Sequence, residues 1–145
     1  MSQSTLGQVL ELFISLKGKD RESKDKLFID ENGIMDDKFY AKNRERSILI
    51  TSNESYLLAK ENNIDVNYGS LGENILIDIN PYNLKVDDKI MIGEIELTIT
   101  QNCTICNSLS KIDTKLPSLL KCDRGIFAKT LQSGKIKKGD RVKIL

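Results

Sequence analysis

Short runs in which every second residue is apolar constrain this fold more than any other feature of the sequence. Isoleucine or leucine recurs at alternate positions within residues 74–80 and again within residues 94–100. A period of two is the period of a β-strand, because successive side chains of a strand point to opposite faces. Gly93 predicts a tight turn that joins a strand at residues 89–92 to the second run. The chain from residue 73 onward is therefore predicted to be β-structure.

The first half of the chain adds two further strands and a helix. Residues 8–15 predict a strand buried on both sides, with Leu10, Leu12 and Ile14 on one face. Residues 47–51 have strand composition, and Ser52 or Asn53 then predicts the N-cap of one short helix of about ten residues. Other segments predict a solvated loop or long hairpin tip at the charged residues 17–26, a tight turn at 32–33 and a strand at 141–145.

Many short strands with turns between them, and only one or two short helices, predict a mainly β fold that closes as a small β-barrel. Closure also removes the exposed edges of so many strands. The 145 residues correspond to a single domain, residues 1–145, which is long enough to bury a core without a metal or disulfide staple.

Composition excludes several classes of function. The chain has no histidine, which excludes a zinc site with histidine ligands and any nucleophile that a histidine activates. Its 22 basic and 21 acidic residues nearly cancel, which argues against general nucleic-acid binding. No apolar run is long enough to span a membrane, and the first residues lack the pattern of a signal peptide. We therefore expect a cytoplasmic protein with free thiols and no membrane or nucleic-acid partner.

A C-x-x-C pair, Cys103 and Cys106, directly follows a predicted strand and carries the most chemical information. Structural zinc needs four soft ligands, and only Cys122 remains to join the pair. A thioredoxin-like redox pair normally belongs to a βαβ setting, which this β-rich context does not supply. Two interpretations remain open on spacing alone: inert core thiols, or one reactive thiolate that carries sulfur or binds a soft metal.

The order and spacing of six segments resemble the MOSC domain, the C-terminal module of molybdenum cofactor sulfurases and of the amidoxime-reducing components. The domain also occurs as short standalone bacterial proteins. The resemblance covers about residues 5–145. The matching segments are residues 46–50, 71–75, 84–93, 103–106, 124–128 and 134–142.

This resemblance implies a β-barrel-like fold around a cysteine that either carries sulfur or ligates molybdenum in a pterin cofactor (molybdopterin). Cys106 matches that cysteine, with Cys103 as its neighbour. Asn74 falls where the family places an asparagine beside the cofactor cleft, and Arg46 and Arg124 fall where the family has arginines, so the three are candidate cofactor-binding residues. An amide can hydrogen-bond a pterin and a guanidinium suits phosphate, although each residue also has a purely structural interpretation. The implied partners are a sulfurtransferase or a molybdoenzyme.

The chain also departs from the family pattern. Where the family commonly has a second glycine and a histidine after Gly33, this sequence has Asp36 and Phe39, and Ile105 replaces a frequent proline. Two alternatives to sulfur or cofactor handling therefore stay open. One is a non-catalytic β-barrel module that binds a small anion or docks onto a sulfurtransferase. The other is molybdenum-dependent reduction of N-hydroxylated compounds, which the amidoxime-reducing relatives imply.

Overall fold

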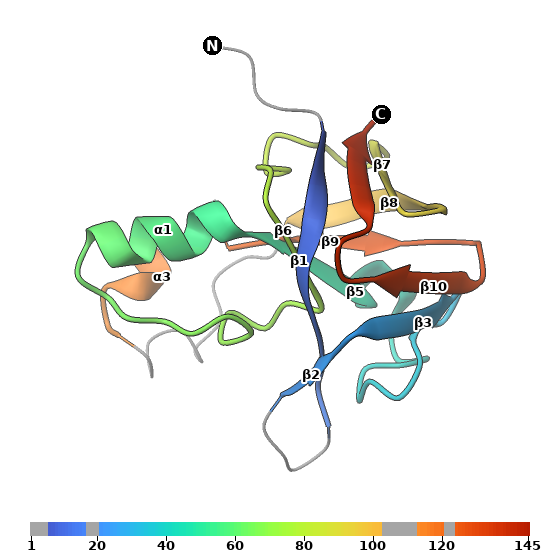
Figure 1. The fold of residues 1–145 in the computed structure, drawn as a ribbon, viewed down its shortest axis with the longest axis horizontal. Coiled ribbons are helices and arrows are strands. Elements are labelled where there is room, and N and C mark those ends of the chain that lie inside the picture. The colour runs from blue at the N-terminus through green and yellow to red at the C-terminus, as the bar shows by residue number, and fades with distance from the viewer. Residues whose placement is uncertain (1–5, 17–20, 103–112, 121–123) are drawn as a thin grey trace.

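The computed structural model describes residues 6–16, 21–102, 113–120 and 124–145 (Figure 1). Within these ranges the chain is mainly β, as predicted, with two short α-helices and one 3-10 turn. The strands are β1 (Leu6–Ile14), β2 (Glu22–Lys24), β3 (Lys26–Asp30), β4 (Gly33–Ile34), β5 (Ile48–Ser52), β6 (Ile75–Ile77), β7 (Lys89–Ile92), β8 (Ile95–Asn102), β9 (Ile126–Lys129), β10 (Gly134–Lys137) and β11 (Arg141–Ile144). The helical elements are η1 (Arg44–Arg46), α1 (Asn53–Glu61) and α3 (Leu116–Leu119).

Seven strands close into a barrel in the order β11-β7-β8-β9-β5-β6-β1, because β1 also pairs with β11. The pairs around the barrel are antiparallel except for β5 and β6, which run parallel. Between β5 and β6 the chain passes through α1, and such a long connection is what a parallel pair requires. The predicted barrel is confirmed.

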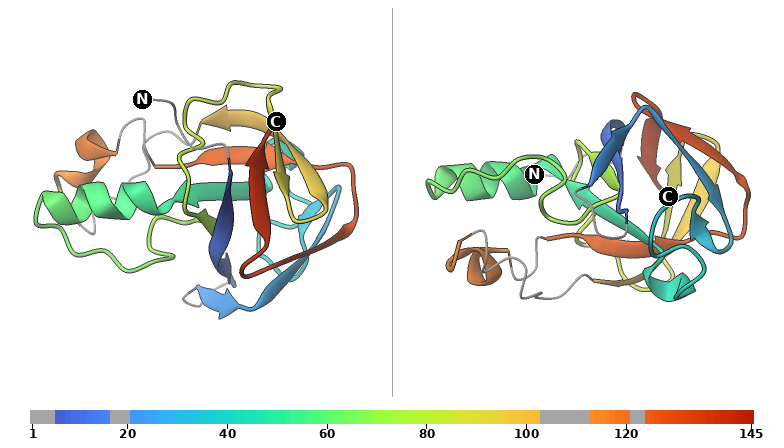
Figure 2. Two further views of the ribbon diagram at one scale, coloured as in Figure 1. Left: turned by 45° about the horizontal axis from the view of Figure 1, so that its top comes forward. Right: turned by 90° about the horizontal axis from the view of Figure 1, so that it is seen from below.

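A separate sheet of three short strands, in the order β10-β3-β4, packs against one side of the barrel. Helix α1 extends from the other side, and the three views agree on this arrangement (Figures 1 and 2). Ser52 is the N-cap of α1, because its hydroxyl accepts a hydrogen bond from the backbone N–H of Glu54. The helix and its cap lie where the sequence predicted them.

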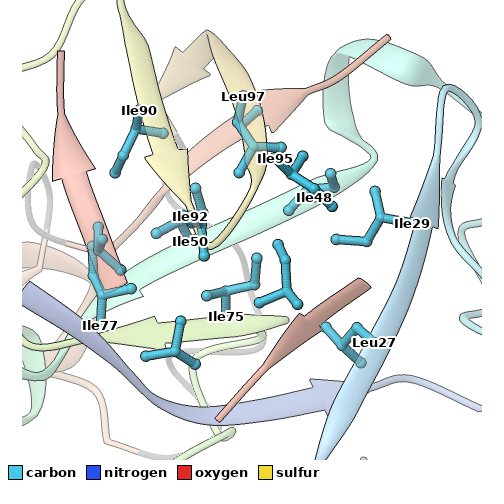
Figure 3. Packing of buried hydrophobic residues seen from close by; sticks show 14 of the residues in the cluster. Leu27, Ile29, Ile48, Ile50, Ile75, Ile77, Ile90, Ile92, Ile95 and Leu97 are labelled. Atoms are coloured by element: carbon cyan, nitrogen blue, oxygen red, sulfur yellow. The ribbon is translucent and has the colours of Figure 1, made fainter. Parts of the chain in front are cut away.

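Alternate residues of the wall strands fill the barrel with apolar side chains (Figure 3). This interior is a packed core, so a ligand site must lie on the outer side of the wall or at the ends of its strands. Fully or almost fully buried members of the core include Leu27, Ile29, Ile48, Ile50, Ile75, Ile77, Ile90, Ile92, Ile95 and Leu97.

The intervening residues of three neighbouring strands are buried on the outer side of the wall. Leu76 of β6 belongs to a second apolar cluster, in which side chains of α1, α3 and the loop before β6 cover the barrel. Leu49 of β5 and Phe127 of β9 form a third, smaller cluster. Strands β5, β6 and β9 are therefore covered on both faces, and the outer covering is where polar groups are also buried.

The structure corrects three details of the sequence prediction. A β-bulge in β1 shifts the register between Val9 and Glu11, so Val9 enters the barrel core and Leu10 packs outside, against the second cluster. Strand β6 covers only Ile75–Ile77, fewer residues than the alternation indicated. Of the two alternatives for the charged segment 17–26, the hairpin agrees with the structure, because β2 pairs with β1. Arg21, the residue before β2, is partly buried, which a solvated segment did not predict.

No helix among the described residues combines the length and the apolar character needed to cross a membrane. The cytoplasmic location stays a prediction.

Asp36 holds a backbone conformation that favours glycine. Its φ is 71°, at the position where the family commonly has its second glycine, and its side chain is exposed. A side chain in this left-handed region is strained by about 1 kcal/mol. We expect Asp36→Gly to raise the free energy of unfolding in denaturant by up to about 1 kcal/mol. Asp36→Ala keeps the Cβ and should bring no gain, whereas equal effects of both variants would contradict a backbone origin.

Candidate functional site

The two cysteines of the C-x-x-C pair, and Cys122, lie outside the described residues, so the predictions made for them stay predictions. Strand β8 ends at Asn102, the residue before Cys103, and Asn102 pairs with Ile126 at the start of β9. Arg124 lies two residues before the start of β9, and its side chain reaches the carbonyl of Leu71 in the loop before β6. The polar residues on the outer side of the wall in this region are described next.

Asn74 joins three segments of the chain through its buried side-chain amide, by bonds to two backbone groups and one side chain. Its Oδ1 accepts a hydrogen bond from the N–H of Leu49 at 3.0 Å. Its Nδ2 donates to the carbonyl of Phe13 at 3.2 Å and to Oδ1 of Asp37 at 3.3 Å. These bonds hold Phe13 of β1 and Leu49 of β5 beside Asn74, the residue that directly precedes β6. They account for a structural role, and the cofactor contact predicted for Asn74 stays a prediction.

Glu73 lies beside Asn74 and has no exposed surface. Its Oε2 accepts hydrogen bonds from the Tyr56 hydroxyl at 2.5 Å and from the Gly69 N–H at 3.1 Å. The Tyr56 oxygen also accepts from the Gly69 N–H at 3.0 Å. The other carboxyl oxygen, Oε1, has no hydrogen-bond partner in the described part of the chain. Oε2 of Glu73 therefore holds the loop before β6, whereas Oε1 is an acceptor without a hydrogen bond among the described residues.

Burial controls the electrostatics of this pair. It raises the pKa of Glu73 above its ordinary value, while the hydrogen bond from Tyr56 and the positive charge of Arg21 act in the opposite direction. Burial, reinforced by the charge of Glu73, raises the pKa of Tyr56 as well. The Tyr56 hydroxyl therefore keeps its proton and remains a donor to Glu73.

Two guanidinium groups approach the same glycine. Nε of Arg124 donates to the carbonyl of Leu71 at 3.1 Å, and Nη2 of Arg21 donates to the carbonyl of Gly72. Gly72 has a φ of 95°, and a Cβ placed on it would lie 3.3 Å from Nη2 of Arg124 and 3.8 Å from Nη2 of Arg21. A larger residue would meet both guanidiniums. Because Gly72 has no side chain, both guanidinium groups can lie close to the same turn of backbone.

Arg21 is cationic although it is largely buried. Burial lowers its pKa, whereas the charges of Glu73 and Asp37 raise it. A guanidinium keeps its proton at any physiological pH, so the charge remains. Paired guanidiniums with planar donor forks are the groups that proteins use to hold phosphate and carboxylate. Nη1 and Nη2 of Arg21 already donate to Oγ of Ser15 and to the carbonyl of Gly72, so an anion at this site would meet the remaining guanidinium donors.

Arg46 lies at the other end of the same surface. It is exposed in η1, and its Cζ is 4.9 Å from the centroid of the Phe127 ring. Phe127 packs with Leu49, and Cδ2 of Leu49 lies 3.7 Å from the position of a Cβ on Gly72. Arg46 and Arg124 are thus connected along the outer side of β5 and β9 by two apolar side chains.

Sequence reasoning missed Arg21, Glu73 and Tyr56. Arg21 stands in a run of charges whose pattern predicted a solvated segment. Glu73 belongs to the Gly-Glu-Asn stretch that formed part of the family resemblance. That stretch could have indicated Glu73, but only its asparagine was given a role.

In the part of the chain that the structure describes, no three carboxylates are arranged to hold a metal ion, and all three cysteines lie outside that part.

Comparison with known proteins identifies one matching family. A family model described as the MOSC domain matches residues 36–143. No curated protein matches the sequence.

Solved structures with the same fold include bacterial proteins. The YuaD protein from Bacillus subtilis is 20% identical, with a TM-score of 0.80 and 94% of each chain covered. YiiM from Geobacillus stearothermophilus is 13% identical, with a TM-score of 0.70 over 99% of this chain and 75% of that one. YiiM from Escherichia coli is 19% identical, with a TM-score of 0.70 over 95% of this chain and 69% of that one. At these identities the likeness concerns the fold.

Proposed function

The chain belongs to the MOSC domain family, and on that premise we propose that it carries sulfur, or binds the molybdenum cofactor, through the thiolate of Cys106. The family is related to the C-terminal domain of molybdenum cofactor sulfurases. In this proposal Cys103 is the neighbouring thiol. A sulfurtransferase or a molybdoenzyme is the partner that supplies or receives the sulfur.

The observation that carries the proposal is the pair of guanidiniums at Gly72. Arg21 and Arg124 both reach this glycine, on the outer side of the wall formed by β5 and β9. The pterin cofactor carries a phosphate, and two guanidinium forks are suited to hold one. Arg124 and Arg21 would bind that phosphate, and Arg46 extends the positive charge along the same surface. Asn74 would hold the backbone of Leu49 and Phe13 in place or contact the pterin.

The chemistry assigned to Cys106 needs only a thiolate. As a nucleophile, the Cys106 thiolate attacks the outer sulfur of a donor persulfide; the donor's S–S bond breaks, and the donor leaves as a thiolate. Cys106 then carries the transferred sulfur as its own persulfide. As a ligand, the same thiolate suits molybdenum, because thiolates are soft donors. Nearby cations favour the deprotonated form of a thiol, which either task requires.

The same guanidinium pair also favours a second candidate function, a module that binds a small anion without thiol chemistry. The two candidates differ in what happens when the cysteine is replaced. Sulfur carriage and metal ligation both require Cys106, whereas anion binding through Arg21 and Arg124 does not.

Intact-protein mass spectrometry, under native and denaturing conditions, tests the proposal. The protein is purified from a host that makes the molybdenum cofactor and is compared with Cys106→Ser, Cys103→Ser and Cys122→Ser. We expect an added mass of one sulfur atom or of a bound pterin in the wild type and in Cys122→Ser, and its loss in Cys106→Ser. An added mass that survives in Cys106→Ser would overturn the role of this cysteine. A bare polypeptide mass for every protein would favour the anion-binding module.

A further inference from the structure

The outward face of the three-stranded sheet carries lysines and an aromatic ring. Strands β3 and β10 lie side by side in Figure 1, and their register places Lys137 opposite Lys26 and Lys135 opposite Phe28. These four side chains are exposed, whereas the alternate residues of both strands enter the barrel core. We call the four exposed residues, Lys26, Phe28, Lys135 and Lys137, the lysine face.

Within the described structure the ammonium group of Lys26 lies 5.5 Å from the centroid of the Phe28 ring, and no carboxylate compensates the charges of the lysine face. Like charges directly opposite each other on two strands destabilise the pair, and Lys26 and Lys137 are such a pair. None of the three lysines on this face has an ion pair among the described residues. Other lysines of the same region do have one: Lys24 pairs with Glu22 at 3.0 Å and Lys138 with Glu11 at 3.2 Å. The lysine face therefore keeps a repulsive arrangement that a negatively charged partner would relieve.

An open pocket of about 410 Å³ adjoins the lysine face. Phe28 and Met35, each 48% exposed, supply its large apolar side chains, and Lys135 lies at its border. Asp30, the carboxylate in the lining, is already engaged, because it accepts hydrogen bonds from the Tyr40 hydroxyl and the Asn32 N–H. The pocket is thus a place for one apolar side chain, with ammonium groups beside it.

We propose that the lysine face and this pocket bind an acidic segment of a partner protein, with one large apolar side chain in the pocket and carboxylates on Lys26, Lys135 and Lys137. Charge complementarity of this kind steers association and selects the partner. A nucleic acid fits the face less well, because successive bases need several stacking rings and Phe28 is the only aromatic residue of the face. An anionic membrane fits less well because the apolar surface is concave. The proposal is independent of the function assigned to Cys106.

Fluorescence anisotropy with a labelled synthetic peptide tests this proposal. The probe peptide contains glutamates around a single leucine; one control peptide replaces the glutamates with lysines, and another replaces the leucine with alanine. We expect the acidic peptide to bind, binding to weaken with added salt, the lysine peptide not to bind, and the alanine peptide to bind more weakly. A single-stranded oligonucleotide or anionic phospholipid vesicles that bind more tightly than the acidic peptide would overturn the proposal.

Charge reversal locates the binding site. The double variant Lys135→Glu with Lys137→Glu should weaken peptide binding on the order of tenfold or more. The matched control, Lys60→Glu with Lys85→Glu, makes the same change of net charge at exposed lysines elsewhere and should leave binding unchanged. Lys137→Glu alone should raise the melting temperature, because it places a carboxylate opposite Lys26. Peptide binding that the lysine-face double variant does not weaken, or that the control weakens equally, would overturn the proposal.

Discussion

Replacing Asn74 with alanine is expected to lower the free energy of unfolding by about 2 kcal/mol. The substitution leaves two buried groups without their side-chain partner, the N–H of Leu49 and the carbonyl of Phe13. Oδ1 of Asp37 also loses a donor but keeps the hydrogen bond from the Ser15 N–H. An unsatisfied buried group costs about 1–3 kcal/mol, and the lowest figure for each group gives the expected total. Urea denaturation followed by circular dichroism measures the effect.

Asn62→Ala is the matched control for Asn74. Asn62 also donates a side-chain hydrogen bond, from Nδ2 to the carbonyl of Leu58 at 2.9 Å, but it is exposed at the end of α1. Water replaces that bond, so the control should change stability by less than about 0.5 kcal/mol. If Asn74→Ala were as stable as the wild type and lost only the bound pterin, the amide would act on the cofactor and not on the fold.

The alternating runs predicted the strands of the barrel because alternation is a property of the local sequence. It does not depend on which strands pair with each other. The bulge in β1 illustrates the limit of this reasoning. Leu10, Leu12 and Ile14 alternate perfectly in the sequence, but β1 pairs with both β11 and β6, and fitting both partners inserts an extra residue between Val9 and Glu11. The face on which Leu10 lies is therefore decided by strands that are distant in sequence.

The candidate site depends even more on distant contacts. Arg21 reaches the carbonyl of Gly72 across 51 positions, and Arg124 reaches that of Leu71 across 53. A charged run has the same composition whether its arginine points to solvent or to a buried carbonyl, so no local pattern identifies Arg21. The family resemblance singled out Asn74 and Arg124 because it compares whole segments in order, which carries information about distant contacts that periodicity does not; their contact with a cofactor stays a prediction.

The largest effect within the site is expected from Glu73→Ala, which should lower the free energy of unfolding by about 3 kcal/mol or more. The substitution leaves the Tyr56 hydroxyl and the Gly69 N–H without the carboxyl oxygen that they share. It also opens a cavity in a place with no solvent exposure, and it removes a negative charge that stabilises Arg21. Denaturant unfolding at neutral pH, compared with that of the wild type, measures the loss.

Glu73→Gln separates the packing of this side chain from its charge. Because the pKa of Glu73 is raised above 4.5 in the folded protein, the folded state binds the proton more tightly than the unfolded state does. The stability contributed by the protonated carboxyl group is therefore complete below pH 4.5 and is lost as the pH rises through the folded-state pKa, by at most about 1.4 kcal/mol per pH unit. Glutamine cannot ionise, so the wild type should lose stability relative to Glu73→Gln as the pH rises from 4.5 toward neutrality. A difference between the two proteins that stays constant over this range would show that the Glu73 carboxyl has an ordinary pKa in the folded protein, and the loop before β6 would then be held by a fully ionised group.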